Sequence, residues 1–115
     1  MQSAVNIIVI QGGVVRDVEL LYTAEGLAYT QFTIANCSLA YKNGEKTEEV
    51  SYFDVSAWAK LAEICAAYLK RGSRVIISGK LKQSRWTSRE GKRKSKIRIV
   101  AQDVKFLPYQ KKVSS

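Results

Sequence analysis

The sequence predicts an all-β fold, a five-stranded barrel with one α-helix between its third and fourth strands. Five segments have the β-branched and aromatic content and the apolar patterns of strands. One segment, which follows the third of them, instead repeats its apolar residues at helical spacing. The chain of 115 residues, 46% hydrophobic and 10% aromatic, is long enough for a single domain with its own core.

The first three strands follow from the pattern of apolar side chains. Val5–Ile10 is a nearly continuous β-branched run, which indicates a strand covered on both faces. After a turn at residues 24–26, the alternating segment Tyr29–Cys37 forms the second strand. Asn43-Gly44 marks a turn in a polar loop, and Val50–Trp58 is the third strand. Its alternation divides the strand into one face with Phe53, Val55 and Ala57 and another with Tyr52, Asp54, Ser56 and Trp58.

The helix is predicted near Lys60–Lys70, because its apolar residues form one stripe. The stripe consists of Leu61, Ile64, Cys65, Tyr68 and Leu69. Gly72 suits the left-handed C′ position that would end the helix. We interpret this helix as a structural plug. Arg74–Trp86 and Ser95–Leu107 are the fourth and fifth strands, joined through a turn at Glu90-Gly91.

This order of elements is typical of an OB-fold barrel, although other small barrels also combine strands with one helix. No linker, repeat or low-complexity segment divides the chain. We therefore expect one OB-fold domain over residues 1–109 and a short basic tail over residues 110–115.

The composition argues against catalysis and against a bound cofactor or metal. Histidine is absent, which removes every scheme that needs a histidine base or ligand. Cys37 and Cys65 have no metal-binding or redox spacing, and we expect both to be reduced and buried. No pair of carboxylates and no phosphate-binding glycine loop is recognisable. The first residues lack the features of a signal peptide and no apolar run could span a membrane, so the expected location is the cytoplasm.

The charge is unevenly distributed along the chain. The first 65 residues hold four basic and eight acidic residues, whereas residues 66–115 hold fifteen basic and two acidic ones. The halves therefore carry formal charges of −4 and +13, within a total of +9. Such asymmetry predicts a polyanionic partner, and the alternative is a solubilising basic face.

Aromatic and basic residues share the outward faces of two predicted strands. Tyr52 and Trp58 lie on the third strand, and Lys80, Lys82 and Trp86 lie on the fourth. Cations can contact the phosphates of a single-stranded nucleic acid, while flat rings stack on its unpaired bases. This combination predicts a surface for single-stranded nucleic acid that need not prefer any sequence.

Each of these features also has a purely structural interpretation. Trp58 can belong to the core, and Tyr52 can be an ordinary cross-strand partner. Tyr41 lies in the polar loop, where either role is open, and the basic run of residues 92–94 can be a solvated hairpin tip. Trp86 is surrounded by polar and basic residues, which favours binding. Packing roles are expected for Tyr22, Tyr29, Tyr68 and Phe106.

The chain resembles the bacterial single-stranded DNA-binding protein (SSB) family from about Val5 to Leu107. The segments RDVELLYTAEG (residues 16–26) and FTIA (residues 32–35) are similar to stretches of that family. The most specific similarity is in WAKLAEICAAYLKRGSRVIISGKL (residues 58–81). SRWTSREGKRKSKIRIVAQDVKFL (residues 84–107) resembles the last hairpin of the family.

The resemblance implies an OB-fold and a homotetramer around which single-stranded DNA wraps. The stacking aromatics of the family carry over onto Tyr41, Tyr52, Trp58 and Trp86. At Tyr52 and Phe53 the family often has Trp or His. The family also typically continues into a tail with an acidic-hydrophobic tip that recruits replication and repair enzymes. The present sequence stops at KKVSS, so we do not expect these residues to recruit such enzymes.

The predicted function is sequence-independent binding and protection of single-stranded DNA in replication, recombination and repair, at the nucleoid in the cytoplasm. The alternatives are an RNA-binding OB domain and a non-catalytic accessory subunit that docks a protein. The predicted nucleic-acid-binding residues are Tyr41, Tyr52, Trp58, Lys60, Lys80, Lys82, Arg85, Trp86, Arg89, Lys94 and Lys96. The doubly apolar first strand predicts association through its outer face.

Overall fold

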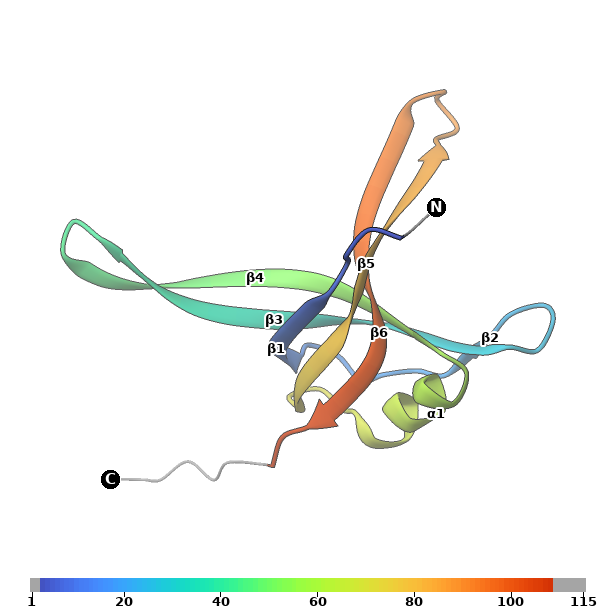
Figure 1. Ribbon diagram of the computed structural model, residues 1–115, viewed down its shortest axis with the longest axis horizontal. Helices are drawn as coiled ribbons and strands as arrows, with labels where there is room; N and C mark the ends of the chain where they lie inside the picture. The colour runs from blue at the N-terminus through green and yellow to red at the C-terminus, as the bar shows by residue number, and fades with distance from the viewer. Residues whose placement is uncertain (1–2, 109–115) are drawn as a thin grey trace.

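The computed structural model describes residues 3–108, whose strands close into a β-barrel with one helix packed against it (Figure 1). The elements are β1 (Ile8–Val14), β2 (Leu21–Tyr22), β3 (Ala28–Lys42), β4 (Glu45–Trp58), α1 (Ala59–Tyr68), β5 (Arg74–Thr87) and β6 (Arg93–Phe106). The strands pair in the order β1–β5–β6–β4–β3, and a β1–β3 pairing closes the ring. The two-residue β2 adds to β3 outside this ring. The predicted OB-fold barrel is confirmed, with the helix after its third barrel strand, β4. The predicted tail, residues 110–115, lies outside the described residues.

The barrel core is built from the inward-facing residues of its five strands. All strand pairs are antiparallel except β4 and β6, which run parallel with Val55 beside Ile99. The most deeply buried strand residues include Val14, Ile34, Val55, Ala57, Val75, Ile77 and Ile99. Because strand side chains alternate, each of these strands turns its other face outward. The outward faces of β3, β4, β5 and β6 carry the candidate site.

Two long hairpins extend beyond the barrel, one formed by β3 and β4 and the other by β5 and β6 (Figure 1). The prediction of a polar loop between the second and third strands is wrong. The pairing of β3 with β4 continues as far as Lys42, which lies beside Glu45. The predicted turn at Asn43-Gly44 is confirmed, with φ of 52° and 78°. A turn this tight keeps the two strands in register. Alternation is lost in this hairpin because most of its residues are exposed on both faces.

The first strand is covered on one face only, contrary to the expectation from its apolar run. It begins at Ile8 instead of Val5 and continues to Val14. Ile8 and Ile10 pack against the core. Val5, Ile7 and Val9 point the other way and are 90%, 78% and 65% exposed. The prediction failed because β-branched content marks a strand without showing whether both faces are covered within one chain.

The helix is shorter than predicted, and its buried stripe is rotated. It spans Ala59–Tyr68, and the chain leaves it at Leu69 in an extended conformation. Ala62, Cys65 and Leu69 join the core, whereas Tyr68 is exposed. Gly72 does have a positive φ of 91°, but in a turn closed by the Ser73 N–H donating to the Lys70 carbonyl, not at the C′ position. No helix among the described residues could span a membrane.

The two cysteines differ, which corrects the expectation that both are buried. Cys65 on α1 is buried in the core, and burial raises the pKa of its thiol to about 11. Cys37 is exposed, because the β3–β4 hairpin has left the barrel at that point. Both are free thiols.

We expect Ala59→Gly to stabilise the protein by about 0.5–1 kcal/mol. Ala59 follows Trp58 at the start of α1 with φ of 55°, a left-handed conformation that costs a non-glycine residue about 1–2 kcal/mol. Glycine relieves this cost and loses only part of the gain to its larger freedom in the unfolded chain. Urea unfolding followed by circular dichroism measures the change. The control is Ala67→Gly, an exposed position in α1 with ordinary φ, where a loss of about 1 kcal/mol is expected. Equal losses at both positions would contradict the strain at Ala59.

Candidate nucleic-acid interface

One outward face extends across β3, β4, β6 and β5, and the strand register determines which residues share it. On β4 the face holds residues 52, 54, 56 and 58, and β3 contributes the residues beside them. Lys96 of β6 forms an ion pair with Asp54 of β4, which places the even-numbered residues of β6 on the same face. In the antiparallel pairing of β5 with β6, Lys82 lies beside Arg98, Ser84 beside Lys96 and Trp86 beside Lys94.

Trp58 is supported from one side by another ring. It lies opposite Tyr29 in the β3–β4 register, and the two rings stack with centroids 5.2 Å apart and planes 26° apart. The predicted packing role of Tyr29 is thus confirmed. Trp58 remains 42% exposed, and Trp86 on the β5–β6 hairpin is 47% exposed. Both tryptophans therefore present ring surface to a ligand, and Trp58 does so from a fixed position.

A groove of about 460 Å³ lies beside Trp58 on this face. Its lining comprises Asn6, Ser56, Trp58, Lys80, Leu81, Lys82, Ser84, Arg98 and Val100. Asn6 holds the N-terminal segment against β5: its Nδ2 donates to the Leu81 carbonyl (2.8 Å), and the Leu81 N–H donates to its Oδ1 (2.9 Å). The groove unites three predicted residues, Trp58, Lys80 and Lys82.

Sequence reasoning missed Arg98 and Asn6. Arg98 could have been identified from the alternation of β6, which places it with Lys94 and Lys96. Asn6 could not, because its contact with Leu81 spans 75 residues of the chain.

A second hollow of about 430 Å³ surrounds Trp86 near the end of the β5–β6 hairpin. It is lined by Gln83, Arg85, Trp86, Thr87, Arg93, Lys94 and Ser95. The Arg85 guanidinium donates to Gln83 Oε1 (2.9 Å), on the opposite side of the strand from Lys82 and Trp86. Two of the predicted cations, Arg85 and Lys94, therefore lie around Trp86 rather than beside Trp58.

The other predicted residues are more widely spread. Tyr52 is exposed in a separate hollow near Arg16, and Tyr41 is exposed towards the tip of the β3–β4 hairpin. Arg89 lies in the turn that joins β5 to β6, and Lys60 is exposed in the first turn of α1. The structure thus brings the predicted residues together as two clusters, one at each tryptophan, with outlying positions on either side.

Asp54 is an anion within this basic face, and two neighbours stabilise its charge. The Lys96 ammonium holds the pKa of the Asp54 carboxyl below its usual value of 3.8, and the Thr33 hydroxyl, which donates at 2.9 Å, adds to the effect. Partial burial of the carboxyl opposes this lowering. Lys96 is therefore engaged by a carboxylate of the protein itself.

We expect the Asp54–Lys96 pair to give the protein a small stability increment that disappears in acid. Because the folded-state pKa of Asp54 lies below 3.8, the increment is present above that pH and is lost as the pH falls through the folded-state pKa. The Asp54 side chain is 37% exposed, so screening by water limits the increment to at most about 1 kcal/mol. Urea unfolding of wild type and Asp54→Asn should differ by a constant amount from about pH 8 to pH 5 and converge below about pH 4. Asp103→Asn, at an exposed carboxylate outside the face, is the matched control. A difference that persists unchanged at pH 2 would contradict the ion pair.

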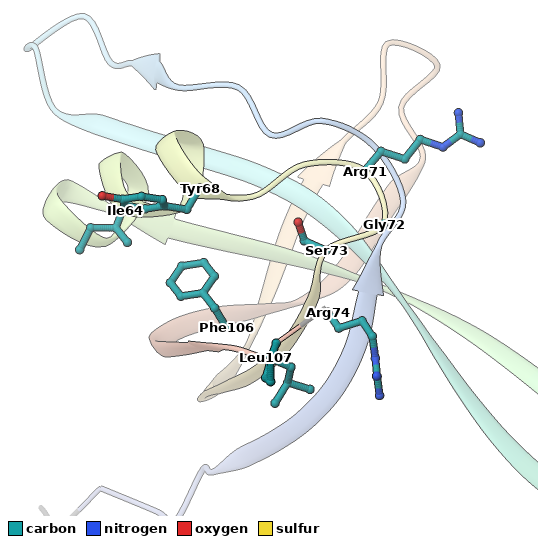
Figure 2. Close-up of a pocket in the computed structure, with 9 residues that line it drawn as sticks. Ile64, Tyr68, Arg71, Gly72, Ser73, Arg74, Phe106 and Leu107 are labelled. Carbon is teal, nitrogen blue, oxygen red and sulfur yellow. The ribbon is translucent and has the colours of Figure 1, made fainter. Parts of the chain in front are cut away.

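A larger hollow than those at the two tryptophans lies between the end of α1 and the end of β6 (Figure 2). Its volume is about 800 Å³, and Tyr68 and Phe106 meet there edge to face with ring centroids 6.1 Å apart. Arg71 and Arg74 also line it (Figure 2). None of the eleven predicted binding residues contributes to this hollow. Among the described residues, no group of three or more His, Cys, Asp or Glu side chains could hold a metal ion.

Comparison with known proteins places this barrel in a family. The single-stranded DNA-binding protein of Treponema pallidum is 38% identical over 103 residues, which cover 90% of this chain and 58% of that protein. That of Borreliella burgdorferi is also 38% identical over 103 residues, covering 89% of this chain and 69% of that protein. The chain thus spans only part of the length of these relatives.

A solved structure shares the fold. The Plasmodium falciparum SSB complex with ssDNA has a TM-score of 0.84 at 18% identity, over 94% of this chain and 99% of that one. The model of the single-strand binding protein family matches residues 5–107. The chain belongs to the single-strand binding protein family.

Proposed function

We propose that this protein binds single-stranded DNA with little sequence preference and without catalysis. The observation that carries the proposal is one outward face on which half-exposed tryptophans alternate with cations. Trp58 lies in a groove with Lys80 and Lys82, and Trp86 lies beside Lys94 in a hollow that Arg85 lines from the other side of the strand. Relatives named single-stranded DNA-binding proteins, and a structural neighbour solved with ssDNA, support the same assignment.

The two kinds of side chain would act on the two parts of a nucleotide. Unpaired bases stack on Trp58 and Trp86, at about 1–3 kcal/mol per base, and every base offers a face for this. The lysines and arginines neutralise phosphates and release counterions. Tyr52 and Tyr41 would extend the path along the β3–β4 hairpin, with Lys60, Arg89 and Lys96 as further phosphate contacts. Such a surface protects a strand without reading its sequence, as replication, recombination and repair at the nucleoid require.

We propose further that copies of the chain associate through β1, as a homotetramer. Val5, Ile7 and Val9 form an exposed apolar row on its outer face, which a partner surface would cover. Sedimentation or light scattering gives the mass in solution. A monomer at micromolar concentration would overturn this proposal and leave single-strand binding untouched.

A fluorescence titration tests the binding function. Stacked bases should quench Trp58 and Trp86 when oligothymidylate of about 35 nucleotides is added, and the association constant should fall with salt at a log–log slope of roughly −0.7 per phosphate neutralised. Duplex DNA of the same length and oligouridylate are run beside it. Quenching by oligothymidylate alone supports the proposal. Stronger binding of oligouridylate would assign the surface to RNA, and no quenching by any of them would overturn nucleic-acid binding altogether.

A further inference from the structure

We propose that Arg98 anchors a phosphate of the bound strand beside the Trp58 platform, through the N–H of its Nε. The ligand class is a phosphodiester of single-stranded nucleic acid. The inference deepens the proposed function and rests on it. It adds a directional hydrogen-bond donor to the groove in which Lys80 and Lys82 lie with Trp58, the ring proposed to stack on a base.

The first observation is an unsatisfied donor. Arg98 Nε is buried and has no hydrogen-bond partner within residues 3–108. A buried N–H without an acceptor loses its water without compensation, so native proteins rarely leave one unpaired. Arg98 is also a lining residue of the groove beside Trp58. Because Nε itself is enclosed, the guanidinium has to turn toward the groove for an acceptor there to satisfy this donor.

The second observation is the charge around Arg98. Lys82 lies directly beside it on β5, and Lys80 lines the same groove. Asp54 is close enough for the Arg98 charge to act on it, but its oxygens already accept from Lys96 and Thr33. Three cations gathered at one groove, with the neighbouring carboxylate engaged elsewhere, favour an anion from outside the protein.

The third observation is the shape of the groove. Its volume of about 460 Å³ lies within the usual range of small-ligand sites. Trp58 offers a stacking surface, while Ser56 and Ser84 supply hydroxyl groups. A guanidinium presents Nε–H and Nη–H in one plane, which matches two oxygens of a phosphate, whereas a lysine supplies only a point charge. A base on Trp58 and its adjoining phosphate on Arg98 fit these groups.

The test separates the Nε hydrogen bond from the charge. Arg98→Lys keeps the charge and removes the fork, so we expect an oligothymidylate of about eight nucleotides, within the site size of one OB fold, to bind about tenfold more weakly at every salt concentration. The salt slope should stay unchanged for Arg98→Lys and become shallower by about 0.7 for Arg98→Gln. Arg71→Lys makes the same exchange in the hollow beside α1 and should bind like wild type.

A second measurement uses the unaltered protein. In a ¹H–¹⁵N spectrum the Arg98 Nε resonance, identified by its loss in Arg98→Lys, should shift downfield on addition of oligothymidylate. Wild-type affinity in Arg98→Lys, or an Nε resonance that does not move when the strand binds, would overturn the phosphate anchor. Failure of the wild-type protein to bind any strand would instead overturn the proposed function.

Discussion

Gly79→Ala should destabilise the protein by about 3 kcal/mol or more and lower its melting temperature by roughly 10 °C. A Cβ at this position would lie 2.0 Å from the carbonyl oxygen of Val100 and 2.9 Å from its carbonyl carbon. Both atoms belong to the backbone of β6, which lies between β4 and β5 and cannot move without disturbing both pairings. The close approach occurs where the β5–β6 register shifts at Ser78–Gly79.

Thermal and urea unfolding of Gly79→Ala measure this effect, with Gly13→Ala as the matched control. Gly13 lies on β1, where no described residue other than its chain neighbours has a heavy atom within 4 Å of the position its Cβ would take, and its φ lies outside the left-handed region. The control should change stability by less than about 1 kcal/mol. Similar unfolding midpoints for the two variants would contradict this prediction, because they would show that β6 shifts enough to accommodate the added methyl group. Because Val100 also lines the groove beside Trp58, a folded Gly79→Ala protein should also bind oligonucleotide more weakly.

Trp58→Ala should weaken binding of oligothymidylate by about 2 kcal/mol, or about thirtyfold. The substitution removes the indole ring, so no base stacks at this position, and Tyr29 loses the ring that it packs against. Trp86 lies in the separate hollow and stays available as the fluorescent reporter. Trp58→Phe keeps a ring at the same place and should recover most of the affinity.

Stability has to be measured on the same variants, because Trp58 also packs on Tyr29. Loss of that ring pair is expected to cost about 0.5–1.5 kcal/mol of folding free energy. A correctly folded Trp58→Ala protein with a wild-type binding isotherm would show that Trp58 acts in packing alone. A loss of affinity that Trp58→Phe recovers would assign the ring to the bases.

The order of elements could be predicted because it depends on local patterns. β-Branched alternation, a helical stripe and turn residues such as Asn43-Gly44 each act over a few neighbouring positions. The pairing of β4 with β6, and the insertion of β6 between β4 and β5, are contacts between distant segments. The order of elements and the family resemblance both pointed to an OB-fold, which implies that arrangement, but no local pattern contains it.

The candidate site was predictable where it depends on alternation along one strand. Tyr52 and Trp58 share a face of β4, and Lys80, Lys82 and Trp86 share a face of β5, because side chains alternate with a period of two. Alternation cannot show which strands lie side by side. The Tyr29 stack on Trp58, the Lys96 ion pair with Asp54 and the unpartnered Nε of Arg98 all depend on that.

The sequence by itself determined the strands, the helix, the basic second half of the chain and the aromatic residues of the face. The tertiary structure alone decided the distribution of these groups. It extended the β3–β4 hairpin into solvent and exposed Cys37, left one face of β1 uncovered, and rotated the helix so that Ala62 is buried and Tyr68 is exposed. The physical reason is that burial depends on which surfaces meet when the barrel closes, and those surfaces come from segments far apart in the chain.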